Sequence, residues 1–492
     1  MDNSLLQIRD FGTKEIEQAV KTFTQNPQGM AEFVEAVKQE ALGRAVAFIG
    51  DVLTGYDTIL RESASRRKDW DIVRRDTKSL ITSIGDVRFS KTLFKNKNNG
   101  ERRYLLDDFL GAEAHERLSE DAEAALLEEA VQTSYRRGGM AVSILDSVSK
   151  ETVKDKIHAL EFPPEKKQKH RGRKRIVDYL FIDADEDHVA LQFQEKKGDL
   201  QINAAGRKCN GAISKLVYVY EGVEPEAPRS KRHHLINPHY FSGTYEGKKN
   251  KDLWDEIYTY LENTYDLSRV KKIYLSGDGG EWIKSGGRRL HGVTYALDEF
   301  HMREYLIQMT RHLQDSAEEA QKVLISVIKE DTKEEFLSFI DMLMGYAETD
   351  AERRNVQTGA DYLLNNWMAA KVRMTDRKVL RGCSAEGHVS HVLSARMSRG
   401  PMGWSRRGVD KMSRLRAYKW NGGDMLELVR YQRQAPKAPA EKDVLSASEI
   451  ISSEHNGGPT WGRYVDGLQV ETSVEIKKIM SIGMYDFIWR LR

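Results

Sequence analysis

Residues 176–193 read IVDYLFIDADEDHVALQF, and this stretch limits the possible folds more than any other part of the chain. Its composition is typical of a β-strand, in which successive side chains point to opposite faces. Strict alternation then puts Asp183, Asp185 and Asp187 on one face, together with Tyr179 and Phe181. Three carboxylates that project in the same direction make this strand the first element of a candidate acidic site.

The elements after this strand follow an order typical of a ribonuclease-H-like fold. KLVYVYEGV and HHLINPHYFSG indicate two more strands, KKNKDLWDEIYTYLENTYDL indicates a helix, and RVKKIYLSGDGG indicates a short buried strand that ends at Asp278. In such a fold the first aspartate lies within the first strand and the second at the end of the fourth. Because these strands are adjacent and parallel, they bring Asp185 and Asp278 together across 278 − 185 = 93 residues.

A third acidic residue is expected from a helix. Glu386 is the second residue of the stretch AEGHVSHVLSARM, whose apolar residues trace one helical face. The separation 386 − 278 = 108 residues exceeds what a compact fold needs, and residues 301–375 are almost entirely helical in pattern. We therefore expect a catalytic domain of residues 177–300 and 376–432, with residues 301–375 as an inserted helical domain.

Asp185, Asp278 and Glu386 have the chemistry of a two-metal site and are predicted to be both metal ligands and catalytic residues. Two Mg²⁺ ions about 4 Å apart can activate a nucleophile and stabilise the leaving oxygen in phosphodiester chemistry. Mg²⁺ prefers carboxylate oxygens, and Mn²⁺ is expected to substitute. Each residue alone also fits an ordinary role as a surface charge, a turn residue or part of a helix N-terminus. Asp183 and Asp187 stay open as alternatives for the first ligand.

The region before the catalytic domain is expected to bind DNA. Residues 1–104 are predicted to be helical to about residue 80, followed by a β-hairpin. Residues 105–162 have a pattern typical of a helix-turn-helix. Ser149 would cap the second helix, whose exposed residues would face a major groove; an ordinary helical hairpin is the alternative. These exposed residues are Lys150, Thr152, Lys154 and Lys156.

Two basic clusters extend the predicted DNA-binding surface, although the net charge is only 77 − 75 = +2. Residues 163–176 form a basic linker, and a second cluster lies between residues 393 and 420. Clustered Lys and Arg side chains neutralise phosphates. The alternatives are a solvated linker and an exposed helix face. The residues predicted to contact DNA here are Lys174, Arg175, Arg396, Arg399, Arg406 and Arg407. Residues 433–492 read as a linker and a C-terminal tail.

The sequence argues against several classes of protein. Cys209 and Cys383 are its two cysteines, which argues against a disulfide framework and a cysteine-rich zinc site. Apolar runs are shorter than the roughly 18 residues of a membrane span, and the glycine-rich GDGGEWIKSGG lacks the Gly-Lys-Ser or Gly-Lys-Thr of a P-loop. We expect a cytoplasmic, nucleoid-associated protein that needs neither a membrane nor a nucleotide cofactor.

Four blocks of sequence also carry a family resemblance. FIDADEDHVALQ, YLSGDGGEWI, YALDEFHMREYL and CSAEGHVSHVLSARMSRGPMGWS resemble the signature blocks of bacterial DDE transposases of the ISLre-two insertion-sequence family, which are similar in their catalytic domain to Mutator-like transposases. The resemblance implies an Mg²⁺-dependent enzyme that cleaves at insertion-sequence ends and joins the 3′-OH ends to target DNA. It assigns the triad to Asp185, Asp278 and Glu386.

The resemblance also implies a supporting role for Asp298 and His301, which lie in the DEFH motif and share one helix face. The alternatives are a helix cap for Asp298 and a structural role for His301. Trp367 could stack on a DNA base, but we expect it in the core of the helical region.

We therefore expect an α/β multidomain protein with a ribonuclease-H-like catalytic core and a helical insertion, preceded by a mostly helical DNA-binding region. Its partners would be double-stranded DNA, as terminal repeats and as target, and further copies of the chain in a homo-oligomer. Two other functions stay open: a catalytically inactive, transposase-derived DNA-binding regulator, and a structure-selective nuclease on the same fold.

Overall fold

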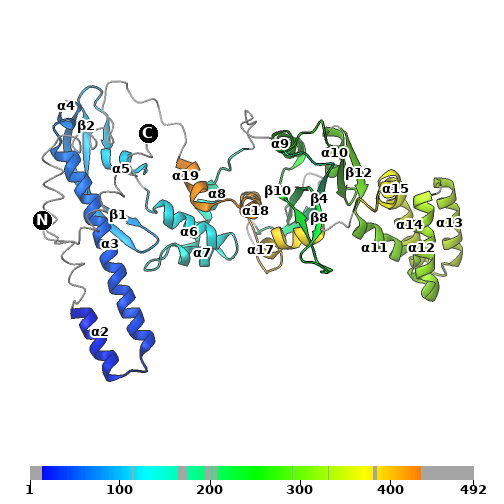
Figure 1. Ribbon diagram of the computed structural model, residues 1–492, viewed down its shortest axis with the longest axis horizontal. Coiled ribbons are helices and arrows are strands. Elements are labelled where there is room, and N and C mark those ends of the chain that lie inside the picture. The colour runs from blue at the N-terminus through cyan, green and yellow to red at the C-terminus, as the bar shows by residue number, and fades with distance from the viewer. Residues whose placement is uncertain are drawn as a thin grey trace. The chain divides into compact units, whose positions relative to one another are not determined.

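A computed structural model describes residues 14–112, 116–164, 174–193, 201–202, 208–290, 292–330, 332–380 and 385–433 (Figure 1). The chain forms two compact units. The first contains the described residues up to 130, residues 134–153 and residues 425–433, and the second contains residues 131–133 and 154–424. Residues 165–173 of the expected basic linker, Cys383, and residues 434–492 of the expected tail lie outside the described residues. No helix in the described ranges is both long and apolar enough to cross a membrane.

The first unit pairs a long helix with a three-stranded antiparallel sheet. Helix α3 packs on the sheet through Ile59 and Leu60, which join Val87, Phe89 and Phe94 in one apolar core. The sheet has the order β1-β2-β3. Its elements are α2 (Lys14–Gln25), α3 (Met30–Glu62), α4 (Arg66–Asp69), β1 (Trp70–Ile81), β2 (Asp86–Asn96), β3 (Arg102–Tyr104) and α5 (Leu105–Leu110).

Strand β1 corrects the expectation of helix up to about residue 80. Its residues pair with β2 from Trp70↔Asn96 to Ile81↔Asp86. Most of its side chains are exposed, including Ile72 and Val73, so the sequence carries little of the alternation that marks a half-buried strand. Pairing with the next strand of the chain decides the structure here.

The other helices of the first unit are α6 (Glu120–Ala130), α7 (Tyr135–Ala141) and α19 (Met425–Arg433), and α8 (Lys150–Ala159) begins in the first unit and ends in the second. The Ser149 Oγ accepts the Thr152 N–H at 3.2 Å, so Ser149 caps α8 as expected. Helix α19 packs on α6, where Arg430 forms an ion pair with Glu120 at 2.7 Å. Helices exist at the positions of the expected helix-turn-helix, and its role in DNA binding stays a prediction.

The second unit is built around a mixed five-stranded sheet with the order β10-β7-β4-β11-β12. Strand β4 pairs antiparallel with β7 and parallel with β11, and β11 pairs parallel with β12. The strands are β4 (Tyr179–Ala190), β7 (Gly211–Tyr220), β10 (His239–Gly243), β11 (Lys272–Gly277) and β12 (Val293–Leu297). This unit is therefore α/β, with β4 at the centre of the sheet and β11 beside it.

Two short ribbons accompany the sheet. They are β5 (Gln201–Ile202) with β6 (Lys208–Cys209), and β8 (Gly222–Pro225) with β9 (His233–Ile236). The expected third strand, HHLINPHYFSG, is thus divided: its first half forms β9, and its second half forms β10 of the main sheet. Asn237, with a φ of 49°, turns the chain between the halves.

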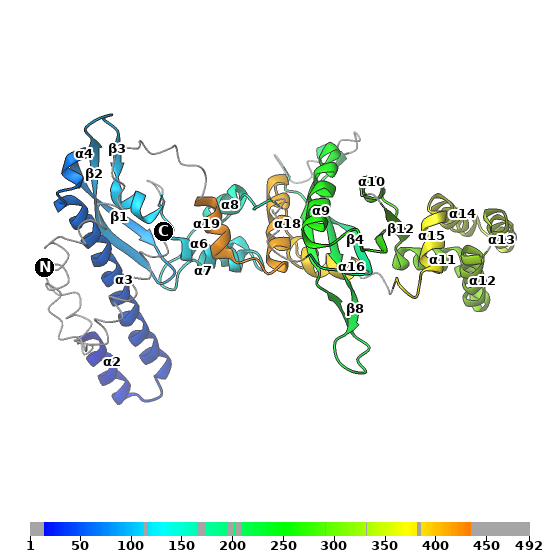
Figure 2. The same cartoon turned by 45° about the horizontal axis from the view of Figure 1, so that its top comes forward.

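Helices α9 (Asn250–Thr264) and α10 (Glu281–Arg289) cover one face of the sheet, and Figure 2 shows α9 next to β4. Leu253, Trp254 and Ile257 of α9 share a core with Leu180 and Ile182 of β4. A Cβ atom on Gly286 would come within 2.4 Å of the Trp254 ring, so this glycine lets α10 approach α9 closely.

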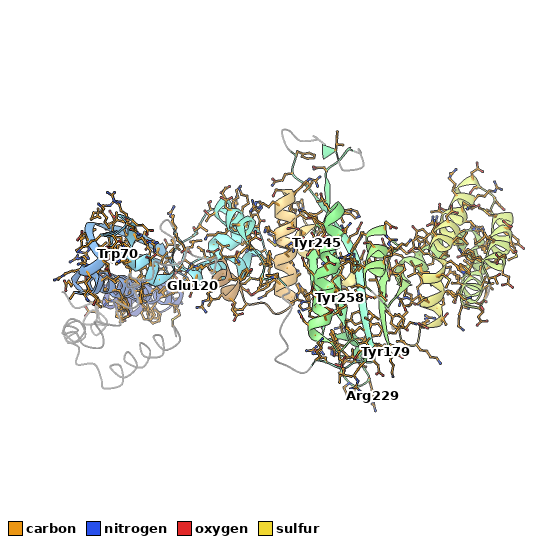
Figure 3. The ribbon with its side chains drawn as sticks, turned by 90° about the horizontal axis from the view of Figure 1, so that it is seen from above. Trp70, Glu120, Tyr179, Arg229, Tyr245 and Tyr258 are labelled. Atoms are coloured by element: carbon orange, nitrogen blue, oxygen red, sulfur yellow. The ribbon has the colours of Figure 1, made fainter. Side chains whose placement is uncertain are left out.

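The opposite face carries α16 (Ala385–Val389), a π-helical turn η3 (Ser390–Ser394), α17 (Ala395–Met397) and α18 (Arg406–Trp420). Ser214 of β7 and Ser413 of α18 share a buried hydrogen bond of 2.7 Å. The Tyr245 ring, labelled in Figure 3, lies 4.5 Å below the Arg414 guanidinium, and its hydroxyl donates to Glu256 of α9 at 2.7 Å. Short η1 (Gly247–Lys249) leads into α9.

Residues 299–375 form a helical region, as expected. Its helices are α11 (Glu299–Thr310), η2 (Arg311–Ser316), α12 (Ala317–Glu330), α13 (Lys333–Tyr346), α14 (Asp350–Asn365) and α15 (Trp367–Thr375). Capping boxes of Thr332 with Glu335 and Thr349 with Glu352 begin α13 and α14. The helices enclose their own apolar core, in which Trp367 is 6 % exposed and packs on Phe336. This bears out the expected core position of Trp367.

Candidate acidic site

Asp185 lies on β4 and Asp278 directly follows β11, and these two strands are adjacent and parallel, as the sequence predicts. The last paired residues of β4 and β11 are Asp183 and Ser276, and Asp185 and Asp278 each come two residues later. Asp278 directly follows β11, where its Oδ1 accepts the Gly280 N–H at 2.8 Å. The Asp185 Oδ1 accepts the N–H of the next residue, Glu186, at 2.8 Å. Both carboxylates are thus anchored beside their own backbone at one point of the sheet.

The environment of Asp185 opposes its negative charge. Burial raises its pKa from 3.8 to about 6, and the charges of Asp278 and Asp298 act in the same direction, while His301 and the Glu186 N–H lower it. The pKa is therefore the net result of desolvation and of carboxylates that repel one another. A cation placed here would relieve this repulsion.

Asp298 and His301 join the acidic pair. The Asp298 carboxylate caps α11 by accepting the His301 N–H at 3.1 Å, and it also contacts the His301 Nδ1 at 2.8 Å. This hydrogen bond and the charges of Asp298, Asp185 and Asp278 raise the pKa of His301 to about 9, against the effect of burial. Asp298 is 4 % exposed. The pair thus supplies a third carboxylate and an imidazolium beside Asp185 and Asp278, and the cap expected as an alternative is also present.

Asp183 is a structural residue in this arrangement. It is 1 % exposed, and the hydroxyls of Tyr218 and Tyr220 donate to its Oδ2 at 3.0 and 3.2 Å. Asp187 is 7 % exposed and accepts the Ser398 hydroxyl at 3.0 Å; burial raises its pKa. The charge of Asp185 interacts with that of Asp278.

Glu386 lies on α16, which packs against β4, but its side chain is exposed. Within the described ranges, no three or more His, Cys, Asp or Glu side chains are arranged so that they could hold a metal ion. The interacting group is Asp185, Asp278, Asp298 and His301, and the place of Glu386 in a metal-binding triad stays a prediction.

His388 is a neighbour of Glu386 that the sequence did not single out. Its Nδ1 lies 3.0 Å from the Tyr240 hydroxyl, and its ring centroid lies 4.5 Å from that of Tyr218. Burial lowers its pKa to about 4, so the imidazole is neutral at pH 7. It fixes α16 to the sheet strands β7 and β10. Its spacing of two residues from Glu386 was visible in the sequence, but its aromatic partners come from distant strands.

The predicted DNA-binding residues of α8 are polar and near the surface. Lys150 and Lys154 are exposed and lie beside Glu151 at 3.8 Å and Asp155 at 3.1 Å. Surface pairs of this kind are weak enough for phosphates to replace. Thr152, Lys156 and half-buried Lys174 also belong to the predicted set, and Arg175 forms an ion pair with Glu221 at 2.7 Å.

The second basic cluster is largely committed to contacts within the second unit. Arg399 contacts the Ser390 hydroxyl, Arg406 pairs with Glu246 at 3.0 Å, and Arg407 donates to the His158 carbonyl at 2.8 Å. All three arginines remain exposed.

Arg396 requires a correction, because it is 5 % exposed and its guanidinium lies 4.8 Å from the Trp404 ring centroid. Stacking on an aromatic ring removes it from solvent, so it is not an exposed phosphate contact.

Comparisons with known proteins identify relatives. The model of an uncharacterised protein family, UPF0236, matches residues 23–435. Two UPF0236 proteins of Caldanaerobacter subterraneus subsp. tengcongensis are each 33 % identical over 418 residues, which cover 85 % of this chain and 83 % or 79 % of the relative. The solved Drosophila P element transposase strand transfer complex aligns with 73 % of this chain and 87 % of its own at 9 % identity, with a TM-score of 0.20. At that TM-score the likeness supports no conclusion about this chain.

Proposed function

The chain belongs to the UPF0236 family, and we propose that it is a metal-dependent DNA transposase that cleaves DNA strands at the ends of an insertion sequence and joins the 3′-OH ends to target DNA. The observation that carries the proposal is the interaction of Asp185 and Asp278 on adjacent parallel strands. It agrees with the ribonuclease-H-like arrangement that the order of elements predicts.

The strand order supports the same reading. In chain order, the main sheet runs third, second, first, fourth, fifth, with the first and fourth strands parallel and adjacent. Asp185 is on the first of these strands, and Asp278 directly follows the fourth. The helical region of residues 299–375 follows the fifth strand and separates these elements from α16, which carries Glu386. We propose that this region is an insertion into the catalytic domain.

The donor atoms suit Mg²⁺ or Mn²⁺. Asp185 and Asp278 offer hard carboxylate oxygens, and the raised pKa of Asp185 reflects a position where negative charge needs compensation. These two residues would hold the metal, with Glu386 as the proposed third ligand. When bound, two such ions supply Lewis-acid activation of the nucleophile and stabilisation of the leaving oxygen.

The chain's own residues would orient the site. Asp298 holds the imidazole of His301 near Asp185 and Asp278, so its positive charge offsets part of their repulsion. A metal must compete with this imidazolium for the acidic pair, and we assign His301 to support rather than to metal ligation. Exposed Lys150, Lys154, Arg399, Arg406 and Arg407 are proposed to contact DNA phosphates.

The test is cleavage of duplex DNA that carries the ends of the insertion sequence encoding the chain. Full-length protein with Mg²⁺ or Mn²⁺ should nick this duplex and join its 3′-OH ends to a second duplex, whereas Asp278→Ala and Glu386→Ala should lose both activities. Glu281→Ala is a matched control, because Glu281 lies only three residues after Asp278 but is an exposed carboxylate that pairs with Arg288.

The reaction products distinguish the proposed transposase from the two alternative functions. Hydrolysis without joining would indicate a nuclease, and binding without cleavage would indicate a regulator. Equal cleavage by wild type and Asp278→Ala would refute the proposed mechanism.

A further inference from the structure

The backbone on which Asp278 stands is held by two tyrosine hydroxyls. Tyr362 of α14 donates to the Asp278 carbonyl at 2.7 Å, and Tyr295 of β12 donates to the carbonyl of Gly277, the preceding residue, at 3.2 Å. Burial and the charge of Asp278 raise the pKa of both hydroxyls, so both keep their protons. Two consecutive carbonyls at the end of β11 are therefore fixed from outside the strand.

A buried arginine ties the same strand end to its neighbour. Arg373 of α15 is 1 % exposed; its Nε donates to the Leu297 carbonyl at 2.7 Å, and its Nη2 donates to the Ser276 hydroxyl at 2.9 Å. Leu297 ends β12 immediately before Asp298, and Ser276 lies two residues before Asp278. One guanidinium thus spans the ends of the two strands that carry these acidic residues.

The junction between α14 and α15 also contacts the turn after Asp278. Gly279 has a φ of +97°, and a Cβ atom there would lie 2.8 Å from the Asn366 Oδ1. Asn366 is 7 % exposed and is itself held, because its Nδ2 donates to the Tyr362 carbonyl at 2.9 Å. The turn is therefore enclosed by the helices and cannot accept a larger residue without movement.

The helices that make these contacts are rigidly packed. The Tyr362 ring stacks on Tyr305 of α11 with centroids 3.9 Å apart, and Leu363 and Ala370 on either side of the junction belong to the core of the helical region. Ordinary packing of a helix on a sheet would bury apolar surface at scattered positions. Here hydrogen bonds from Tyr362 and Arg373 converge on the atoms next to Asp278 and Asp298.

We propose that Tyr362 and Arg373 are positioning residues through which helices α14 and α15 set the location of the Asp278 carboxylate for metal binding. This inference rests on the proposed function, since it assigns to the helical region a part in assembling the metal site. A displacement of α14 would move the Asp278 backbone directly, through the Tyr362 hydrogen bond.

The test uses Tyr362→Phe, which removes the hydroxyl but keeps the ring. Tyr305→Phe is the matched control, because it changes the other ring of the same stack. In full-length protein, amide exchange of residues 276–281 should become about three- to tenfold faster in Tyr362→Phe alone, as expected when one hydrogen bond is lost. Mn²⁺ binding, measured by electron paramagnetic resonance, should weaken by a similar factor.

Catalysis supplies a readout that general destabilisation does not reproduce. Tyr362→Phe should lower kcat and raise the Mg²⁺ concentration for half-maximal cleavage, with the KM for DNA unchanged, and saturating Mn²⁺ should restore part of kcat. Arg373→Lys, which keeps the charge but loses the forked geometry, should behave similarly. If Arg373→Lys fails to fold, Tyr362→Phe still decides.

The outcomes distinguish the two proposals. If wild type binds Mn²⁺ and Asp278→Asn does not, the proposed metal site is supported. If, in addition, Tyr362→Phe matches Tyr305→Phe in amide exchange or in Mn²⁺ affinity, the positioning role is wrong. If wild type and Asp278→Asn bind Mn²⁺ equally weakly and neither cleaves DNA, the proposed function itself fails, and the positioning role fails with it.

Discussion

Replacing Asp185 by asparagine should stabilise the metal-free protein at neutral pH. Asparagine keeps the shape of the side chain and the Oδ1 that accepts the Glu186 N–H at 2.8 Å, but it carries no charge. The wild-type carboxylate is held in a place where burial, Asp278 and Asp298 disfavour its charge. The substitution removes the unfavourable free energy of this buried charge.

The size of the effect follows from the pKa of Asp185. The pKa rises from 3.8 to about 6, which at about 1.4 kcal/mol per unit corresponds to about 3 kcal/mol. Solvent screening at this half-buried group reduces the expected gain to about 1–2 kcal/mol. Because the folded pKa lies above the unfolded value, the stability contributed by Asp185 is fully present below pH 3.8 and is lost as the pH rises through about 6.

Urea unfolding in EDTA at pH 7.5 and at pH 4.5 measures this difference. Asp185→Asn should be more stable than wild type at pH 7.5, and the gap should narrow at pH 4.5. Asp178→Asn is the control, since Asp178 is an exposed partner of Lys271 at 2.8 Å. A gap of equal size at both pH values, or a wild type that is the more stable protein at pH 7.5, would refute the electrostatic reasoning.

Three further substitutions test the second unit through urea unfolding. Gly279→Ala should cost about 1–3 kcal/mol because of its positive φ, whereas Gly287→Ala, whose Cβ would meet no atom closer than 3.9 Å, should be neutral or stabilising. The half-buried His388 has a folded pKa of about 4, below its ordinary 6.5, so wild type should lose stability as the pH falls from 6.5 toward 4, and His388→Gln should not. Trp367→Ala should lower the free energy of unfolding by about 3–5 kcal/mol. The control Met368→Ala, at a side chain 69 % exposed, should lower it by less than about 0.5 kcal/mol. Weaker DNA binding by Trp367→Ala at unchanged stability would contradict the core assignment.

Local pattern was enough to predict the strands that carry the acidic residues. Strand β4 was predictable because it is long and rich in β-branched and aromatic residues, and β11 because a short apolar run ends at Asp278 and two glycines. Their adjacency followed from the order of elements. The helical region was equally predictable, since both capping boxes are written in the sequence as Thr and Glu at the required spacing.

Other elements depend on contacts that no local pattern encodes. Helix α10 contains Gly286 and Gly287, which disfavour a helix, and it forms because Gly286 admits the Trp254 ring. Strand β1 is stabilised by pairing with β2 from Trp70 to Ile81, interrupted by a register shift between Ile72 and Arg74, although most of its side chains face solvent.

The same limit applies to single residues. Arg396 reads as one cation in a basic cluster until Trp404 covers it, and Asp183 is indistinguishable from Asp185 in the sequence until Tyr218 and Tyr220 donate to it. Which acidic or basic side chain is exposed is decided by partners far away in the chain.

The central place of β4 also has a consequence for folding kinetics. Its antiparallel pairing with β7 joins residues 218 − 183 = 35 positions apart, whereas its parallel pairing with β11 joins residues 276 − 183 = 93 positions apart. Longer loops cost more entropy to close, so pulse-labelled amide exchange should show protection of β7 before β11. Simultaneous protection would contradict this order. Asp185 would then come close to Asp278 late, after the antiparallel half of the sheet has formed. The electrostatic repulsion between the two carboxylates would raise the free energy of the last step of folding rather than that of the folding nucleus.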